Sequence, residues 1–118
     1  MIIGIGIDLI ELRRINDLIK RQEKFADRVL AEEELNIYKN LSNKKKPEYL
    51  AGRFAAKEAF SKALGTGIGA HLSFQDIVTE TDDRGKPTLF CQKTKDKKIH
   101  LSITHTREYA AAQVIIEE

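Results

Sequence analysis

The segment from Pro47 to Leu64 constrains the fold of this chain more than any other. Its first residue is a proline, which suits the first turn of a helix, and Gly65 follows it, as glycine often follows a helix C-terminus. Large apolar residues form one arc of this helix and five alanines line the other side. A helix that is apolar or small nearly all round is a buried one. The rest of the chain must therefore cover it.

After the first turn, four charged residues interrupt this apolar helix: Arg53, Lys57, Glu58 and Lys62. Charges on a buried helix are costly unless they are paired or contact a ligand. We therefore look for the functional site on this segment first.

The start of the chain reads as a strand. Ile3, Ile5 and Ile7 fall on one face, and Gly4 and Gly6 leave the other face bare, which lets another backbone or a ligand approach closely. Further patterns predict helices over residues 10–24 and 32–41, a hairpin of strands 76–81 and 87–92, and strands around 99–103 and 110–116. The order predicts a mixed α+β fold in one domain, residues 1–118.

Size and charge exclude several classes of protein. The 118 residues leave room for one domain, and the net charge of +2 is low for a dedicated nucleic-acid binder. No apolar run approaches the ~20 residues that cross a bilayer, and the first residues lack a basic leader. Cys91 is the only cysteine, so no internal disulfide can form. We expect a cytoplasmic protein without nucleic-acid or membrane partners, and a chain this small often builds its pocket between subunits.

Asp8 and Glu58 are the carboxylates of greatest interest. Asp8 stands where the first strand's alternation stops, and Glu58 is the only acid of the long helix after its first turn. One interpretation is that each pairs with an Arg or Lys. The other is that they hold Mg²⁺, which takes one or two carboxylates and completes its shell with water and phosphate oxygens.

Two further features are compatible with phosphate chemistry. Glu58 and Lys62 share a helix face, and an acid for a metal with an ammonium for phosphate makes a phosphoryl-transfer pair. His105 stands at a strand end among hydroxyl side chains, either as a structural hydrogen-bonding group or as a phosphate contact. The glycine-rich residues 65–69 follow a helix instead of opening one, so they match no nucleotide-binding fingerprint, and helix capping explains Gly65.

The first predicted helix carries a basic side with few acids. This side is either ordinary solvated charge or a docking surface for one acidic partner. Two alternatives to an enzyme follow: a non-catalytic module that recognises acidic proteins through Arg14 and Arg21, and a small polyanion binder that uses residues 44–46.

Three stretches together carry a family resemblance. They are Gly4-Ile5-Gly6-Ile7-Asp8, the long stretch from Gly52-Arg53-Phe54 through Lys57-Glu58-Ala59 to Gly65-Thr66-Gly67, and Leu101-Ser102-Ile103-Thr104-His105-Thr106. The chain resembles the holo-acyl-carrier-protein synthases, the short bacterial type of 4′-phosphopantetheinyl transferase, essentially from end to end. That resemblance implies an antiparallel sheet with a long buried helix, assembled as a homotrimer with active sites between subunits.

The resemblance also implies a reaction. A serine hydroxyl of apo acyl carrier protein attacks the β-phosphate of coenzyme A, takes the phosphopantetheine arm and releases 3′,5′-ADP, in support of fatty acid biosynthesis. Asp8 and Glu58 would bind Mg²⁺, and Lys62 would act in catalysis by contacting phosphate and protonating or stabilising the leaving group. Glu58 or a metal-associated water would be the general base. Larger relatives carry a second acid where this chain has Ile10, so the metal shell would depend more on water and phosphate.

The resemblance assigns two further groups of residues. The coenzyme A site would be lined by Arg53, Lys57, Lys62, Gly65, Thr66, Gly85, Pro87, His105 and Thr106. Arg14, Arg21 and Lys24 would dock the carrier protein. In the trimer, Asp8, Glu58 and Lys62 of one chain would meet Arg53 or His105 of the next.

Overall fold

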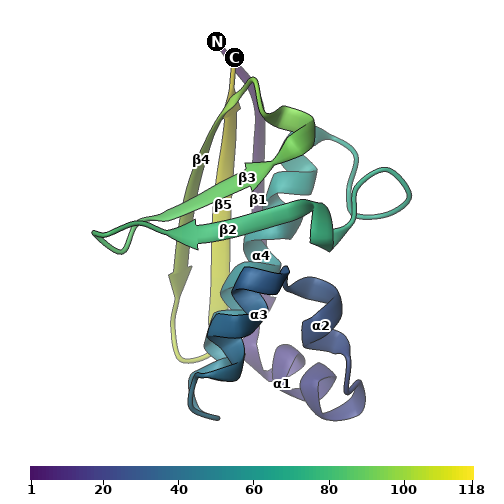
Figure 1. The fold of residues 1–118 in the computed structure, drawn as a ribbon, viewed down its shortest axis with the longest axis vertical. Helices are drawn as coiled ribbons and strands as arrows, with labels where there is room; N and C mark the ends of the chain where they lie inside the picture. The colour runs from purple at the N-terminus through teal and green to yellow at the C-terminus, as the bar shows by residue number, and fades with distance from the viewer.

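A computed structural model describes all residues, 1–118, and shows a three-stranded antiparallel sheet crossed by one long helix. The sheet has the order β1 (Ile2–Glu11), β5 (Tyr109–Glu117) and β4 (Lys98–His105). The long helix α4 (Lys46–Leu64) packs on one face of this sheet and contacts all three strands. Figure 1 shows the two termini side by side at one end of the molecule. The predicted α+β fold with antiparallel strands is confirmed.

The remaining elements surround α4. Helices α1 (Leu12–Arg21), α2 (Phe25–Val29) and α3 (Glu32–Lys39) gather at the end of the molecule away from the termini (Figure 1). Strands β2 (Ile77–Thr81) and β3 (Pro87–Cys91) form a separate antiparallel hairpin. Single 3₁₀ turns at Phe74–Asp76 and Gln92–Thr94 precede and follow this hairpin. No helix of the structure has both the length and the apolar composition needed to cross a bilayer.

The helix crosses the sheet obliquely, from β4 at its N-terminal half to β1 at its C-terminal half. A methyl group built on Gly52 would lie 3.2 Å from the Ile103 side chain on β4. On β1, a methyl group built on Gly6 would lie 1.8 Å from the Ala59 carbonyl oxygen, and one on Gly4 2.1 Å from the Ala63 carbonyl oxygen. The bare glycine face predicted for the first strand is therefore the place where a backbone approaches, and that backbone is α4.

Strand alternation divides β1 into two faces. Gly4, Gly6 and Asp8 face the helix, and the isoleucines between them face outward. The outward residues stay exposed to 49% at Ile3, 60% at Ile5 and 63% at Ile7. The single chain thus leaves an apolar stripe on the uncovered face of its sheet.

One buried ion pair connects α4 to the elements around it. Lys57 is fully buried, and its Nζ donates hydrogen bonds to Glu34 Oε1 at 2.6 Å, to the Val29 carbonyl at 2.8 Å and to the Phe74 carbonyl at 3.1 Å. These three bonds use all three donors of an ammonium. Burial lowers the pKa of Lys57, and the Glu34 carboxylate opposes that shift.

Glu34 completes the network from the other side. Its carboxylate accepts hydrogen bonds from the Ala31 amide at 2.7 Å, from the Thr79 amide at 2.8 Å and from the Thr79 hydroxyl at 2.5 Å. The structure thus places Lys57, which was expected at the coenzyme A site, in a buried network and not in the lining of the cavity described below. Its side chain has no exposed surface and no free donor, because it holds α2, α3 and β2 against α4.

The tight contact between β1 and α4 generates a stability prediction. Gly6→Ala forces the strand away from Ala59, and we expect it to lower the free energy of unfolding by about 3 kcal/mol. Gly69→Ala is the matched control, because a methyl group there meets nothing within 4 Å and the backbone is unstrained, so we expect a change of less than about 0.5 kcal/mol. Chemical denaturation of both variants measures the difference. Equal stability of the two variants would contradict this packing.

Candidate active site

The carboxylate–ammonium corner lies where β1 passes the second half of α4. Lys62 Nζ lies 3.0 Å from Asp8 Oδ1 and also donates to the Ile7 carbonyl at 3.1 Å. The Asp8 side chain is 14% exposed and the Lys62 side chain 53%, so the carboxylate is held by the fold while the ammonium reaches solvent. One interpretation of the sequence was that Asp8 and Glu58 each pair with an Arg or Lys. Asp8 makes such an ion pair with Lys62.

Glu58 differs from Asp8 because it has no ion-pair partner within 4.0 Å. Burial raises the pKa of Glu58, and the negative charge of Asp8 raises it further, while Lys62 and Arg14 oppose the shift. The acid therefore stands half-buried beside a second carboxylate with no cation bound directly to it. A site of this kind favours a ligand that brings positive charge.

These two carboxylates fit a magnesium ion. Mg²⁺ commonly binds through one or two carboxylates and keeps waters or phosphate oxygens in its other positions. No cluster of three or more His, Cys, Asp or Glu side chains occurs in the structure, so the protein offers this pair and no closed cage. Ile10, the next residue on the helix-facing side of β1, is buried and adds no ligand.

A cavity of about 540 Å³ opens at the other end of α4. Four of the residues expected at the coenzyme A site line it together: Arg53 on α4, Gly85 and Pro87 at the β2–β3 turn, and His105 at the end of β4. Gly85 adopts φ +85°, as the turn requires. Lys45 adds a second permanent cation and Glu48 the only carboxylate. The lining is suited to an anionic ligand.

The other expected coenzyme A residues lie elsewhere. Gly65 ends α4 with φ +91°, and the Thr66 hydroxyl bonds to the neighbouring Gly67 carbonyl at 2.9 Å. Thr106 shapes the β4–β5 turn, where its hydroxyl accepts hydrogen bonds from the amides of Glu108 at 3.3 Å and Tyr109 at 3.1 Å. None of the three lines the cavity, so one chain does not gather the whole expected site.

Helix geometry explains this division. Arg53 and Lys62 are nine positions apart, which places them about 180° apart around α4 and about 14 Å apart along it. The cavity with Arg53 and His105 lies at the β4 edge of the sheet, and the corner with Asp8 and Lys62 lies at the β1 edge. The structure therefore contains two separate clusters of candidate site residues, which we call the two half-sites because the resemblance expects them in one active site.

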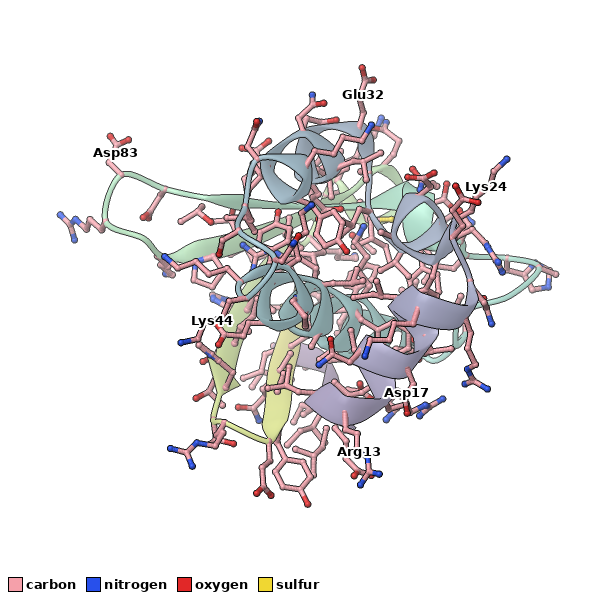
Figure 2. The ribbon with its side chains drawn as sticks, turned by 90° about the horizontal axis from the view of Figure 1, so that it is seen from below. Arg13, Asp17, Lys24, Glu32, Lys44 and Asp83 are labelled. Atoms are coloured by element: carbon pink, nitrogen blue, oxygen red, sulfur yellow. The ribbon has the colours of Figure 1, made fainter.

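The residues expected to dock a carrier are all accessible. Arg14 and Arg21 are exposed on α1, and Lys24 is exposed just before α2. Figure 2 shows the Lys24 side chain pointing outward on the same flank as α1, where Asp17 is the acidic neighbour. The charge of Arg14 also acts on Glu58, so this surface adjoins the carboxylate–ammonium corner.

Eight of the twelve cavity residues were not among those expected at the coenzyme A site: Leu41, Lys45, Glu48, Tyr49, Gly52, Thr81, Ile103 and Thr104. Of these, Lys45 was considered only within the polyanion-binding alternative. For Tyr49 a signal existed, because an aromatic residue four positions before an arginine places both on one helix face. The Arg53 guanidinium lies 4.5 Å from the centre of the Tyr49 ring.

Comparison with known proteins gives one consistent answer. The family model described as the 4′-phosphopantetheinyl transferase superfamily matches residues 4–114. A holo-[acyl-carrier-protein] synthase of Bacillus subtilis is 60% identical over 117 residues, which cover 99% of this chain and 97% of that protein. The corresponding protein of Staphylococcus carnosus is 53% identical over 119 residues, covering 100% and 99%.

Solved structures agree with these sequence matches. A holo-(acyl-carrier-protein) synthase from Bacillus anthracis, crystallised in complex with CoA (3′,5′-ADP), superposes with a TM-score of 0.93 at 52% identity and covers 100% of this chain and 98% of its own. The Helicobacter pylori holo-[acyl-carrier-protein] synthase in complex with coenzyme A gives 0.85 at 36% identity, covering 96% and 99%. With its fold and these full-length matches, the chain belongs to the 4′-phosphopantetheinyl transferase superfamily and, within it, to the holo-[acyl-carrier-protein] synthases.

Proposed function

We propose that residues 1–118 act as one cytoplasmic domain that transfers the 4′-phosphopantetheine arm of coenzyme A to a serine of apo acyl carrier protein. The observation that carries the proposal is the unpaired Glu58 carboxylate beside the Asp8–Lys62 ion pair. The names of the relatives and the coenzyme A bound to two of them support the same substrates.

The reaction displaces one phosphate oxygen by another. The serine oxygen forms a bond to the β-phosphorus, the bond from that phosphorus to the bridging oxygen breaks, and 3′,5′-ADP leaves with the bond's electrons. The serine proton passes to a base, for which Glu58 is suited because its pKa is raised and it has no ion-pair partner. Lys62 reaches solvent with its ammonium, which keeps one donor beyond its bonds to Asp8 and Ile7 for contact with the phosphate oxygens.

Asp8 and Glu58 would also hold Mg²⁺. The bound ion would neutralise part of the pyrophosphate charge, which otherwise repels these two carboxylates. Since Asp8 is already fixed by Lys62 on a strand packed tightly against α4, the fold holds this ligand in place before any ion binds. Whether Glu58 serves as ligand or as base, its charge is needed, so one substitution tests both roles.

Glu58→Gln tests the transfer reaction. Incubation with coenzyme A, Mg²⁺ and apo carrier should add the mass of one phosphopantetheine arm to the carrier, as read by mass spectrometry. We expect Glu58→Gln to lower the rate at least about a hundredfold, because the amide neither accepts the proton nor carries charge. Glu32→Gln, on the exposed first turn of α3, should leave the rate unchanged. An unchanged rate in Glu58→Gln, or no mass gain with the unaltered protein, contradicts the proposal.

We propose that the carrier docks on the exposed basic residues Arg14, Arg21 and Lys24. These basic residues are concentrated on one surface, although the net charge of the chain is only +2. That surface adjoins Glu58 and Lys62, which fits recognition of an acidic carrier through charge. Arg14 acts on the charge of Glu58 as well, so its replacement would disturb the corner itself. Arg21 lies at the C-terminal end of α1. Its replacement therefore tests docking with less effect on the catalytic residues than replacement of Arg14.

Arg21→Glu is the docking test. We expect it to raise the KM for apo carrier about tenfold at low salt, with the affinity for coenzyme A unchanged, because reversal of a docking charge acts on one substrate only. Lys95→Glu removes an exposed cation far along the chain and should alter neither constant. The effect should shrink as salt rises. Equal damage to the kinetics of both substrates would argue against the assignment.

We propose that the chain assembles as a homotrimer with shared active sites. Two features support this: the outward apolar stripe of Ile3, Ile5, Ile7 and Leu9 on an edge strand, and the separation of the two half-sites at opposite edges of the sheet. A contiguous exposed apolar stripe marks an interaction surface, and a closed ring of copies places the β1 edge of one chain next to another chain.

Ile5→Asp tests the assembly. We expect sedimentation to show a trimer for the unaltered chain and smaller species for Ile5→Asp. A carboxylate buried in an apolar interface is desolvated without a partner, which destabilises the assembly. Transfer activity should fall with the trimer, since each half-site is then incomplete. Ile37→Asp, at a 49% exposed position on α3, is the matched control and should keep both the trimer and the transfer activity. A fully active monomer would overturn the shared site.

A further inference from the structure

The Lys62 ammonium is bound to one of the two carboxylates proposed to hold Mg²⁺. Its Nζ lies 3.0 Å from Asp8 Oδ1 and donates a second hydrogen bond to the Ile7 carbonyl at 3.1 Å. Glu58, the other carboxylate, has no ion-pair partner, and the charge of Asp8 contributes to its raised pKa. Lys62 is therefore the one cation that the free chain binds directly at this corner.

Electrostatics makes this ammonium a competitor of the metal. A divalent cation on Asp8 would lie close to the Lys62 charge, whichever carboxylate oxygen it used, and like charges at such short range repel. Lys62 must then leave Asp8 or weaken the binding of the ion. The lysine side chain can leave, because it is 53% exposed and has a flexible stem. Asp8 stays in place, since its side chain is only 14% exposed on a strand packed tightly against α4.

The charge of the corner indicates what draws Lys62 away. Two carboxylates and one ammonium leave a single negative charge, which a divalent cation alone would turn into a positive one. A pyrophosphate that binds together with the ion brings two negative charges and restores the original sign. Its oxygens are also strong acceptors for an ammonium. The corner thus keeps its charge only when the metal and the pyrophosphate bind together.

We propose that Lys62 occupies Asp8 in place of the metal in the free protein and leaves it when a pyrophosphate ligand binds. The identity of that ligand rests on the proposed function, in which coenzyme A supplies the pyrophosphate. Lys62 thereby acts before the chemical step as well as in it. It keeps the affinity of the empty site for Mg²⁺ low and makes metal binding depend on coenzyme A.

Lys62→Met measures this competition. The variant keeps an unbranched side chain without its charge, and Mn²⁺ is the probe, because its spin-resonance signal decreases on binding. We expect the Kd of the full chain for Mn²⁺, without coenzyme A or carrier, to fall about tenfold. Saturating coenzyme A should reduce this difference to about threefold or less, because the pyrophosphate then draws Lys62 from Asp8 in the unaltered chain as well. An unchanged Kd in Lys62→Met, or a difference that bound coenzyme A does not reduce, overturns the inference.

Arg14→Met is the matched control. The charge of Arg14 also acts on Glu58, but Arg14 forms no ion pair with Asp8. Its loss should therefore change the Kd for Mn²⁺ less than about threefold. Equal gains in affinity for the two variants would mean that the loss of any nearby positive charge suffices, and would overturn a specific role for Lys62.

Acetylation of the unaltered chain gives a second measurement that needs no variant. After a brief treatment with acetic anhydride, mass spectrometry of the peptides should show faster modification of Lys62 in saturating Mn²⁺ than without the ion. The exposed Lys95 should react at the same rate in both samples. Equal rates at Lys62 would contradict its release from Asp8. A chain that shows the expected metal binding and labelling but adds no mass to the carrier would instead overturn the proposed function alone.

Discussion

The contact between β1 and α4 determines most of what this chain builds. Backbone meets backbone there, because Gly4 and Gly6 let Ala59 and Ala63 approach to distances that exclude any side chain. Strand alternation then fixes the rest: the next residue on the same face is Asp8, which arrives beside Lys62 at 3.0 Å. The residues between them point the other way and form the apolar stripe. One close approach thus produces both the carboxylate–ammonium corner and the surface proposed for assembly.

The Lys57–Glu34 pair supports α4 from the opposite side. Adjacent positions on a helix point about 100° apart, so Lys57 turns into the network with Glu34 while Glu58 turns toward β1. Removing one partner of a buried pair leaves an uncompensated charge and costs about 3–5 kcal/mol. The pair also determines the arrangement of the elements around α4. It specifies which segments pack on α4, since Val29, Phe74 and Thr79 all bond to it.

Sequence patterns predicted the strands, the hairpin and the long helix with its end at Gly65, since each has a clear period or a strong terminating residue. They missed α2, because its five residues are too few to show a helical period. They also did not predict the buried ion pair of Lys57. Its charge indicated a ligand, but its partner Glu34 comes from a segment 23 positions away, and such a pairing leaves no trace in local periodicity. The cavity was partly foreseen through the family resemblance, while Tyr49 was not placed in it, although its spacing from Arg53 on one helix face is visible in the sequence.

The division of the site follows from size. A chain of 118 residues has one long helix available for functional side chains, and that helix must also fill the core. Small residues occupy the side of this helix that packs against the sheet. Charged side chains therefore extend only from its two edges, toward β4 in its N-terminal half and toward β1 in its C-terminal half. A single ligand cannot reach both flanks of one such helix unless it wraps around it. A second copy that presents its opposite flank removes this obstacle without a longer chain, which makes assembly part of the proposed chemistry and not an addition to it.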